Sequence, residues 1–284
     1  MRVAYLGPPG TYNDDALQAA AGDAGADAIA ATTVYDAILA VESGDADRAL
    51  VPFENSIEGS VRTTLDTLAL ETTAVAIVGE HDHPIRHSLI ARTELVVDDV
   101  AAVLSHPQAN AQCARFIRDR LPRAEVCSVP STADAVRQVS ESGEPWAALG
   151  ARSAAELYGC VVLAEGVGDE PDNVTRFVWI APRGTQPAGG GPWRTTLVFS
   201  ELGADHPGAL VDALTEFSDR EVNLTRIESR PLRRGLGRYM FFIDLDGAED
   251  DPAVAEAIAR LRDKAESVRI LGSYPVHGTG VPSG

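Results

Sequence analysis

The residues best suited to chemistry stand together in the stretch 173–180, which reads Asn-Val-Thr-Arg-Phe-Val-Trp-Ile. Thr175 supplies a hydroxyl, Arg176 a guanidinium and Phe177 an aromatic ring, so a short segment offers a proton donor, a carboxylate ligand and an apolar wall. The apolar residues that follow predict a strand, on which successive side chains point to opposite faces. A regular strand separates Arg176 from its two neighbours, whereas a bend at Asn173 brings all three to one cleft. Taken alone, the pattern favours an ordinary sheet strand with an exposed arginine.

Polar side chains also stand where other predicted strands give way to helices. In open α/β sheets ligands bind at this edge, and the first backbone N–H groups of a helix attract anions. The turn at 7–11 matches neither GxGxxG nor GxxxxGK[ST], so a carboxylate suits it as well as a phosphate. Ser105 and Gln108 have the spacing of a capping box, and the helix that they start is expected to bury Cys113 and Leu121. The polar candidates at these edges are Thr11, Asn55, Ser56, Ser105, Gln108 and Gln112.

Two other kinds of site are disfavoured by the spacing of their residues. His83 and His87 are four residues apart, but Pro84 between them disfavours a regular helix, so ordinary loop histidines are favoured over a metal site. A Ser-His hydrolase built on Ser105 and His106 is disfavoured because adjacent side chains diverge and no G-x-S-x-G motif is present. We therefore expect neither a metal site at these histidines nor a serine hydrolase at Ser105.

The order of predicted elements divides the chain into two parts. Strands and helices alternate through residues 1–182, which predicts an α/β sheet architecture. Residues 183–192 are rich in Gly and Pro and predict a linker. The order βαββαβ in residues 193–275 is that of a ferredoxin-like domain, and the tail 276–284 is expected to be flexible.

The composition limits the partners and the compartment. A net charge of −18 disfavours nucleic acid and anionic membranes as partners, and no run of about 18 apolar residues predicts a membrane span. The first residues lack a secretory cleavage pattern, and three widely spaced cysteines suit a reducing cytoplasm. Lys264 is the only lysine, which favours a halophilic protein adapted to molar salt over a merely acidic mesophilic one.

Six short motifs stand in order along nearly the whole chain, and together they resemble one family. They are Gly7-Pro-Pro-Gly-Thr-Tyr12, Pro52-Phe-Glu-Asn-Ser56 with Gly59, Ser105-His-Pro-Gln108 with Gln112-Cys113, Asn173-Val-Thr-Arg-Phe177, Gly208-Ala-Leu210 and Glu228-Ser-Arg-Pro231. This set resembles the prephenate dehydratase family with a C-terminal regulatory domain of the ACT type. Two positions depart from the family pattern: Asn13 replaces the usual Ser, and Asn110 replaces a small or apolar residue.

The resemblance implies a fold and a reaction. Residues 1–182 should form two α/β lobes around a cleft, like periplasmic ligand-binding proteins. One lobe is expected from about 1–78 plus 165–182 and the other from about 79–164, followed by the ACT domain at 193–275. The family converts prephenate to phenylpyruvate, water and carbon dioxide without a metal or an organic cofactor, and this chain is expected to do the same.

The resemblance also implies roles at the cleft. Thr175 is expected to donate a hydrogen bond or a proton to the leaving ring hydroxyl, with Asn55 and Gln112 as neutral donors beside it. Arg176 is expected to bind a substrate carboxylate bidentately, and Phe177 to pack the cleft wall. The other expected substrate-binding residues are Thr11, Ser56, Ser105 and Gln108.

For the ACT domain the resemblance implies phenylalanine sites formed by neighbouring subunits, and hence a homodimer or a tetramer. The residues expected at these sites are Gly208, Ala209, Leu210, Asn223, Glu228, Ser229, Arg230 and Pro231. The structural alternative for two of them is an ion pair on the strand surface between Glu228 and Arg230.

Two other functions stay open at this stage. Arogenate dehydratase acts on the same ring, with an amino acid side chain where prephenate has a keto acid, and the sequence does not separate the two. A non-enzymatic amino-acid sensor is a rival of another class, because bilobal clefts and ACT domains both serve as receptors. The intact Thr175-Arg176-Phe177 run argues against the sensor.

Overall fold

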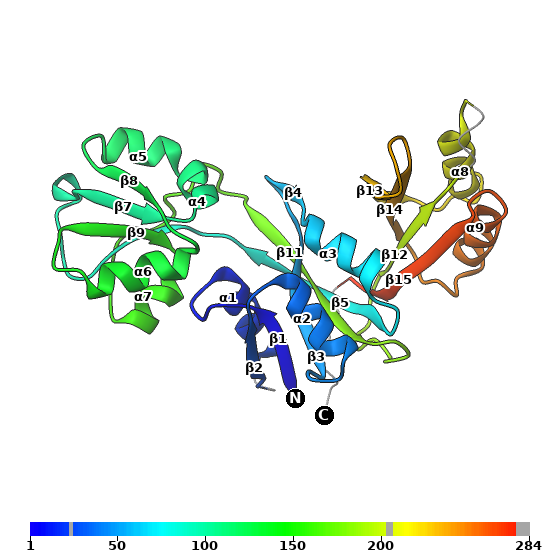
Figure 1. The fold of residues 1–284 in the computed structure, drawn as a ribbon, viewed down its shortest axis with the longest axis horizontal. Coiled ribbons are helices and arrows are strands. Elements are labelled where there is room, and N and C mark those ends of the chain that lie inside the picture. The colour runs from blue at the N-terminus through cyan, green and yellow to red at the C-terminus, as the bar shows by residue number, and fades with distance from the viewer. Residues whose placement is uncertain (23–24, 203–206, 277–284) are drawn as a thin grey trace.

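The computed structural model describes residues 1–22, 25–202 and 207–276, and it forms three bodies in a row (Figure 1). Two α/β lobes lie side by side, and the C-terminal domain packs against the lobe that contains the N-terminus. The tail predicted to be flexible lies outside the described residues except for Val276. No helix in these ranges is long and apolar enough to cross a membrane.

The first lobe is built on strands in the order β5-β11-β3-β1-β2. Strand β1 pairs in parallel with β2 and β3, whereas β11 runs antiparallel to both β3 and β5. Side chains alternate along β1, so Val3 and Tyr5 pack with Leu17 of α1 while Ala4 packs with Ile38 of α2. The elements are β1 (Arg2–Leu6), α1 (Tyr12–Ala21), β2 (Asp27–Ala31), α2 (Val34–Glu42), β3 (Arg48–Asn55), β4 (Gly59–Ser60), α3 (Arg62–Asp66), the π-helical turn η2 (Thr67–Glu71), β5 (Val75–Pro84) and β11 (Val174–Pro182).

The second lobe contains a five-stranded sheet in the order β10-β6-β9-β7-β8. Its elements are β6 (Ser88–Ala91), the short 3-10 turn η3 (Val97–Asp99), β7 (Ala102–Ser105), α4 (Pro107–Gln112), α5 (Ala114–Arg120), β8 (Glu125–Ser128), α6 (Thr132–Glu141), β9 (Trp146–Gly150), α7 (Arg152–Tyr158) and β10 (Val161–Ala164). The chain crosses between the lobes twice, through residues 85–87 and 165–173. Strand β5 stays in the first lobe as far as Pro84, so the first crossing comes later than residue 78, where the sequence placed it.

The helix predicted to run from Ser105 to Leu121 is broken at Cys113, between α4 and α5. The second crossing causes the break. The backbone N–H of Asp169 donates to the Gln112 carbonyl at 2.7 Å, and the Asp169 carboxylate accepts the N–H of Arg115 at 3.1 Å. A residue distant in sequence therefore caps the second helix.

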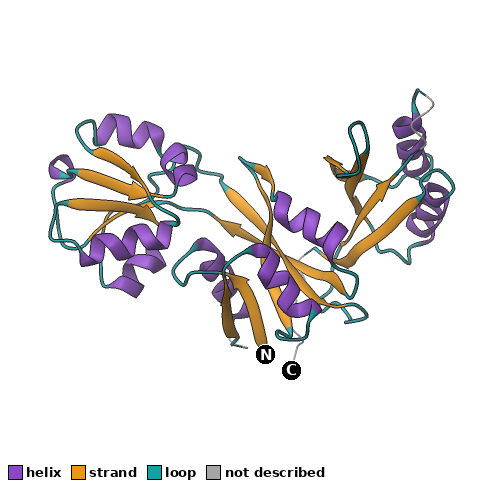
Figure 2. Ribbon diagram, in the orientation of Figure 1, coloured by secondary structure: helices purple, strands orange, loops and turns teal. Residues whose placement is uncertain are grey.

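The C-terminal domain has the predicted βαββαβ order, with its sheet in the order β13-β14-β12-β15. Helices α8 and α9 lie on the side of the sheet away from the lobes (Figure 2) and bury residues such as Phe217 and Ile258 against it. The elements are β12 (Trp193–Ser200), α8 (Ala209–Ser218), β13 (Leu224–Pro231), β14 (Tyr239–Asp246), α9 (Pro252–Arg262) and β15 (Ser267–Pro275). The predicted fold class, a two-lobed α/β unit followed by a ferredoxin-like domain, is confirmed.

Strand β15 also pairs with β5, which joins the sheets of the C-terminal domain and the first lobe into one ten-stranded sheet. The pairing places Gly272 opposite Ile77. A Cβ atom on residue 272 would lie 2.2 Å from the Ile77 carbonyl oxygen, so only glycine permits this approach of the two backbones.

Candidate active site

A cleft of about 810 Å³ lies between the two lobes. Four helices begin at its wall: α1 and α2 from the first lobe, α4 and α6 from the second. Side chains cap these helices, since Thr11, Thr33, His106 and Ser131 accept backbone N–H groups of the first turns. In α1, α2 and α6 the cap leaves the earlier N–H groups of the helix without an intrahelical partner, and these attract anions; α4 begins with Pro107, which has no N–H.

The lining of the cleft is uncharged apart from one satisfied carboxylate. Among the described residues that line it there is no arginine and no lysine. The carboxylate is that of Asp134, which accepts the Ser131 hydroxyl at 2.8 Å as part of the α6 cap. An anionic ligand would therefore be held by backbone N–H groups, hydroxyls and amides.

Thr175 and Asn55 face each other across the β11–β3 strand pair at the cleft. Asn55 Nδ2 donates to Thr175 Oγ1 at 2.9 Å. The orientation of the Asn55 amide is fixed, because its Oδ1 accepts the backbone N–H groups of Ile57 and Glu58 at 3.0 Å each. Since the Thr175 oxygen already accepts a hydrogen bond, its own hydrogen remains available to a ligand in the cleft.

A chain of hydrogen bonds continues from Asn55 across the lobes. Asn55 Nδ2 donates to Asn173 Oδ1 at 2.7 Å, and Asn173 Nδ2 donates to Gln112 Oε1 at 3.0 Å. The same Gln112 oxygen lies 3.0 Å from His87 Nε2, and His87 Nδ1 lies 2.8 Å from the Tyr12 hydroxyl. A neutral His87 that donates from Nε2 leaves Nδ1 to accept from the Tyr12 hydroxyl, which also lies 3.1 Å from the Arg86 carbonyl.

Burial keeps the groups of this chain uncharged. Loss of hydration lowers the pKa of His87, although its hydrogen bond to Gln112 acts in the opposite direction. Burial also raises the pKa of Tyr12 well above its ordinary value. The neighbouring His83 packs edge-on against Phe177, with ring centroids 6.2 Å apart.

The structure brings six of the predicted site residues to the cleft. They are Thr11, Asn55, Gln108, Gln112, Thr175 and Phe177. Three residues that sequence reasoning did not assign complete the hydrogen-bond chain: Tyr12, His87 and Asn173. Asn173 opens the Asn-x-Thr-Arg-Phe motif, and that position is the signal that could have pointed to it.

Arg176 is not among the residues that line the cleft, so the expectation that it binds a substrate carboxylate is not met. Strand β11 pairs with β5 in unbroken register here, and alternation turns Arg176 to the face opposite Thr175. Its guanidinium lies 2.6 Å from Asp244, 3.1 Å from Glu54 and 3.5 Å from Glu80. Burial disfavours its charge, but Asp244 and the other nearby groups outweigh that and raise the pKa of Arg176.

Two predicted serines also lie outside the cleft lining. Ser105 is fully buried and donates its hydroxyl to the Leu149 carbonyl at 2.7 Å, so it is neither a substrate ligand nor the helix cap, which is His106. Ser56 is exposed, and its Oγ accepts the Val174 N–H at 3.1 Å. Both hydroxyls are engaged by backbone groups, which explains why neither is available to a ligand.

The predicted regulatory residues separate onto two sides of the C-terminal domain. Gly208, with φ of 99°, precedes α8, and Ala209 and Leu210 form the start of that helix. Asn223 Nδ2 donates to Asp246 at 2.9 Å. The last four residues of β13 are Glu228, Ser229, Arg230 and Pro231, of which Ser229 and Pro231 are exposed.

Arg230 departs from its expected role. Its guanidinium forms two hydrogen bonds to Asp66 of α3, at 3.0 and 2.6 Å. It therefore faces the first lobe, and the partner is Asp66 instead of the Glu228 that the structural alternative proposed.

Comparison with known proteins decides the family. The family model described as prephenate dehydratase matches residues 3–185, and the model described as ACT domain matches residues 197–263. The chain belongs to the prephenate dehydratase family. The family's member from Mycolicibacterium vanbaalenii is 43% identical over 287 residues, which cover 96% of this chain and 90% of that protein.

Solved structures share the whole fold. Prephenate dehydratase from Arthrobacter aurescens, in complex with L-Phe, is 42% identical with a TM-score of 0.88, and the match covers 97% of this chain and 90% of that one. A protein described as GqqA, a novel type of quorum quenching acylase, is 31% identical with a TM-score of 0.83 and covers 97% of this chain and 98% of its own. The family and the ACT domain are thus as predicted, and the chain is an enzyme of the lyase class. The relatives give the salt-adaptation hypothesis no support.

Proposed function

We propose that this protein converts prephenate to phenylpyruvate, carbon dioxide and water. The observation that carries the proposal is the Thr175 hydroxyl at the cleft, whose oxygen accepts from Asn55 and whose hydrogen is free to be donated. In the reaction the bond between the ring and its carboxylate breaks to release carbon dioxide, and those electrons make the ring aromatic. The ring C–O bond breaks with its electron pair on oxygen, and one proton converts the departing hydroxide to water.

Thr175 acts on that departing oxygen. A threonine hydroxyl is a weak acid, so its main contribution is a hydrogen bond that strengthens as negative charge develops on the leaving group. The side-chain amides of Gln112 and Asn55 both hydrogen-bond to the Asn173 amide and hold it in place without adding a charge. The proton that completes the water comes from solvent.

The two carboxylates of prephenate meet the helix N-termini that line the cleft. Helices α1 and α2 present N–H groups from one lobe, and α6 presents them from the other. A ligand with two anionic groups can therefore bridge the lobes. Phe177 and Ile85 supply apolar wall to the cyclohexadiene ring.

The proposal is tested by mixing purified protein with prephenate and with arogenate in separate reactions. We expect phenylpyruvate, detected by its absorbance, from prephenate and little turnover of arogenate. Faster turnover of arogenate would assign the rival dehydratase activity. No turnover of either substrate by folded protein would leave the non-enzymatic sensor and refute the proposal.

We further propose that phenylalanine regulates this enzyme through an oligomer of at least two subunits. The Arthrobacter relative was solved with L-Phe, and the motifs at 208–210 and 228–231 stand in the ACT domain. Strand β13 is the edge of its sheet within the described residues, so a second subunit can lie against it. Calorimetry with phenylalanine and sedimentation with and without it test both points; no heat and no change in activity would contradict the regulation.

A cytoplasmic location completes the proposal. The relatives are prephenate dehydratases by name, and three free cysteines suit a reducing compartment. Separation of cell fractions with an antibody to the protein tests it, and recovery outside the cytoplasm would contradict it.

A further inference from the structure

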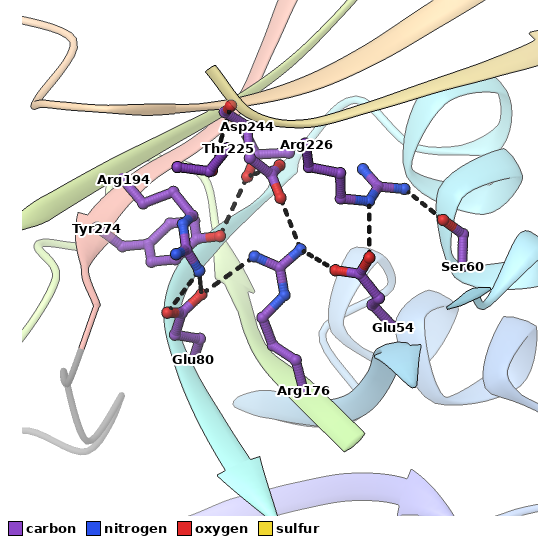
Figure 3. Close-up of polar contacts among 10 residues, drawn as sticks. Glu54, Ser60, Glu80, Arg176, Arg194, Thr225, Arg226, Asp244 and Tyr274 are labelled. Carbon is purple, nitrogen blue, oxygen red and sulfur yellow. Dashed lines mark hydrogen bonds and ion pairs between the residues drawn. The ribbon is translucent and has the colours of Figure 1, made fainter. Parts of the chain in front are cut away.

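The face of the β3–β11 strand pair opposite the cleft carries a cluster of six charged side chains (Figure 3). We call these residues the interdomain cluster. Three come from the first lobe and three from the ACT domain, and all lie within ion-pair distance of another member. They are Glu54, Glu80 and Arg176, and Arg194, Arg226 and Asp244.

Asp244 is held from both sides. One oxygen of its carboxylate accepts from Arg176 at 2.6 Å, and the other accepts the Thr196 hydroxyl at 2.8 Å. Thr196 in turn lies 3.1 Å from the Tyr274 hydroxyl, and all three ACT residues are fully buried. The core of the ACT domain therefore fixes the position of the Arg176 guanidinium.

The charges balance only across the interface. The first lobe contributes two carboxylates and one guanidinium, which leaves one negative charge, and the ACT domain contributes the opposite set, which leaves one positive charge. The side chains of Arg176, Glu80 and Asp244 are 11%, 3% and 0% exposed. Buried charges without partners are strongly unfavourable, so the cluster holds the two domains in one defined relation.

The cluster is also adjacent to the residues that act on the substrate. Arg176 follows Thr175 on β11, and Glu54 precedes Asn55 on β3. The same register pairs Arg176 with Glu54 and Thr175 with Asn55. Since the two pairs share one backbone and point to opposite faces, a shift of the first pair moves the second.

Phe53 stiffens this connection. The register of β3 slips between Arg176 and Phe177, which leaves Phe53 as the extra residue of a bulge. Its buried ring stacks with two guanidinium groups, Arg176 at 4.8 Å and Arg226 at 5.1 Å from the ring centre. One arginine comes from the first lobe and the other from the ACT domain, so both domains hold the bulge in place.

We propose that Asp244 and Arg176 are positioning residues for Thr175, so that the ACT domain forms part of the support of the catalytic strand pair. The inference rests on the proposed function and adds to it a route by which events in the ACT domain reach the cleft. Neither residue touches the substrate. Their effect falls on the geometry of the Thr175–Asn55 pair, and it therefore falls on kcat more than on KM.

The first test replaces Asp244 with Asn in the full chain, with Asp263→Asn on α9 as the matched control, because Asp263 forms an exposed pair with Arg260. We expect Asp244→Asn to lower kcat at least about tenfold with KM within about twofold, and to reduce the response to phenylalanine, while the control matches the wild type. A folded Asp244→Asn enzyme with the kcat and phenylalanine response of the control would overturn the inference. Absence of turnover by the wild-type enzyme would instead refute the proposed function.

A second test separates positioning from stability. If Asp244→Asn does not fold, the double variant Arg176→Gln with Asp244→Asn removes both charges and decides in its place. We expect this double variant to fold and to keep the low kcat; recovery of wild-type kcat would show that the pair serves stability alone. In a Thr175→Ala background, Asp244→Asn should lower kcat by less than about twofold, because the group that it positions is already absent. Independent, multiplicative losses would contradict the inference.

Discussion

Asn55 determines the direction in which Thr175 can act. Two backbone N–H groups fix the orientation of the Asn55 amide, so its Nδ2 group donates a hydrogen bond to the Thr175 oxygen. A threonine held in this way donates to a ligand, which suits a leaving hydroxyl and does not suit removal of a proton. His87 and Tyr12, at the far end of the same hydrogen-bond chain, are also kept uncharged by burial.

The contribution of the Thr175 hydroxyl to kcat is the first quantity to test. We expect Thr175→Ala to lower kcat by at least about a hundredfold, the lower end for a group that assists proton transfer. Thr175→Ser retains the hydroxyl and should keep most of the activity, which makes it the matched control. Steady-state kinetics with prephenate measure both, and near-normal turnover by the alanine variant would refute the role.

His87 is expected to act through Gln112. Replacing it with Leu removes the donor to Gln112 Oε1 while Asn173 still donates there, so we expect a loss of about tenfold in kcat, the equivalent of one neutral hydrogen bond. Tyr12→Phe keeps the ring and removes only the outer hydroxyl, and its effect should be smaller. Equal losses in kcat for both variants would show that the ring nitrogen of His87 is not what matters.

At this scale the sequence led to the correct region of the fold but misplaced three side chains, those of Ser56, Ser105 and Arg176. Asn55 is the last residue of a strand and Thr11 precedes a helix, and the edge rule places such residues at a cleft without knowledge of the fold. Arg176 was assigned to the cleft by motif, although simple alternation on a strand turned it away. Its actual partner Asp244 lies in another domain, and no local pattern reports a contact of that kind.

Among the elements, the strands were easier to foresee than the points at which they end. The order of strands and helices and the βαββαβ domain followed from periodicity. The break at Cys113 and the extension of β5 to Pro84 did not, because each depends on residues brought in from the second crossing and from β11. Propensity is local, and these boundaries are set by tertiary contacts.

Strand β5 carries two histidines whose titration should limit stability in acid. Burial lowers the pKa of His83 to about 4, from an ordinary value near 6.5, and also lowers the pKa of His81. The unfolded chain then binds protons that the folded chain does not, so the free energy of unfolding should fall as the pH drops from about 6.5 towards 4. Urea unfolding at several pH values measures this, and His83→Gln should show a shallower decline; an unchanged slope would contradict the assignment.

The contact of β15 with β5 gives a second prediction for the elements. Gly272→Ala places a Cβ against the Ile77 carbonyl and should lower the free energy of unfolding by about 1–3 kcal/mol. Gly190→Ala in the linker is the control, because nothing lies within 4 Å of a Cβ built there. Urea unfolding of the two variants and the wild type tests the prediction, and equal stability of the two variants would count against it.

At the scale of the whole molecule, a protein of charge −18 must admit a substrate with two negative charges. The structure meets this with a cleft whose described lining has one engaged carboxylate and is otherwise neutral. Many arginines instead form ion pairs with the abundant acids, as Arg194 does with Glu80 at 2.6 Å. The cationic groups therefore hold the domains together, and the helix starts are left to receive the ligand.

The acidic surface leads to a prediction about salt. If the excess of acidic residues is an adaptation to molar salt, screening of their repulsion should raise the thermal midpoint by about 5 °C or more between 0.1 and 3 M KCl. Sucrose at matched water activity is the control, because it strengthens burial without screening charge. Full stability in low-salt buffer, with no gain from KCl, would remove the hypothesis.

A cleft that grips anions with peptide N–H groups has a consequence for how the protein tolerates change. Every residue except proline brings the same N–H group, so the side chains along the first turns of α1, α2 and α6 can drift while the anion contacts persist. A mutation destroys these contacts when it disrupts the start of the helix, by removing the cap or by introducing a proline. The affinity for the dianion therefore depends on the conformation of the main chain. The side chains whose identity matters are the few that contact the leaving oxygen.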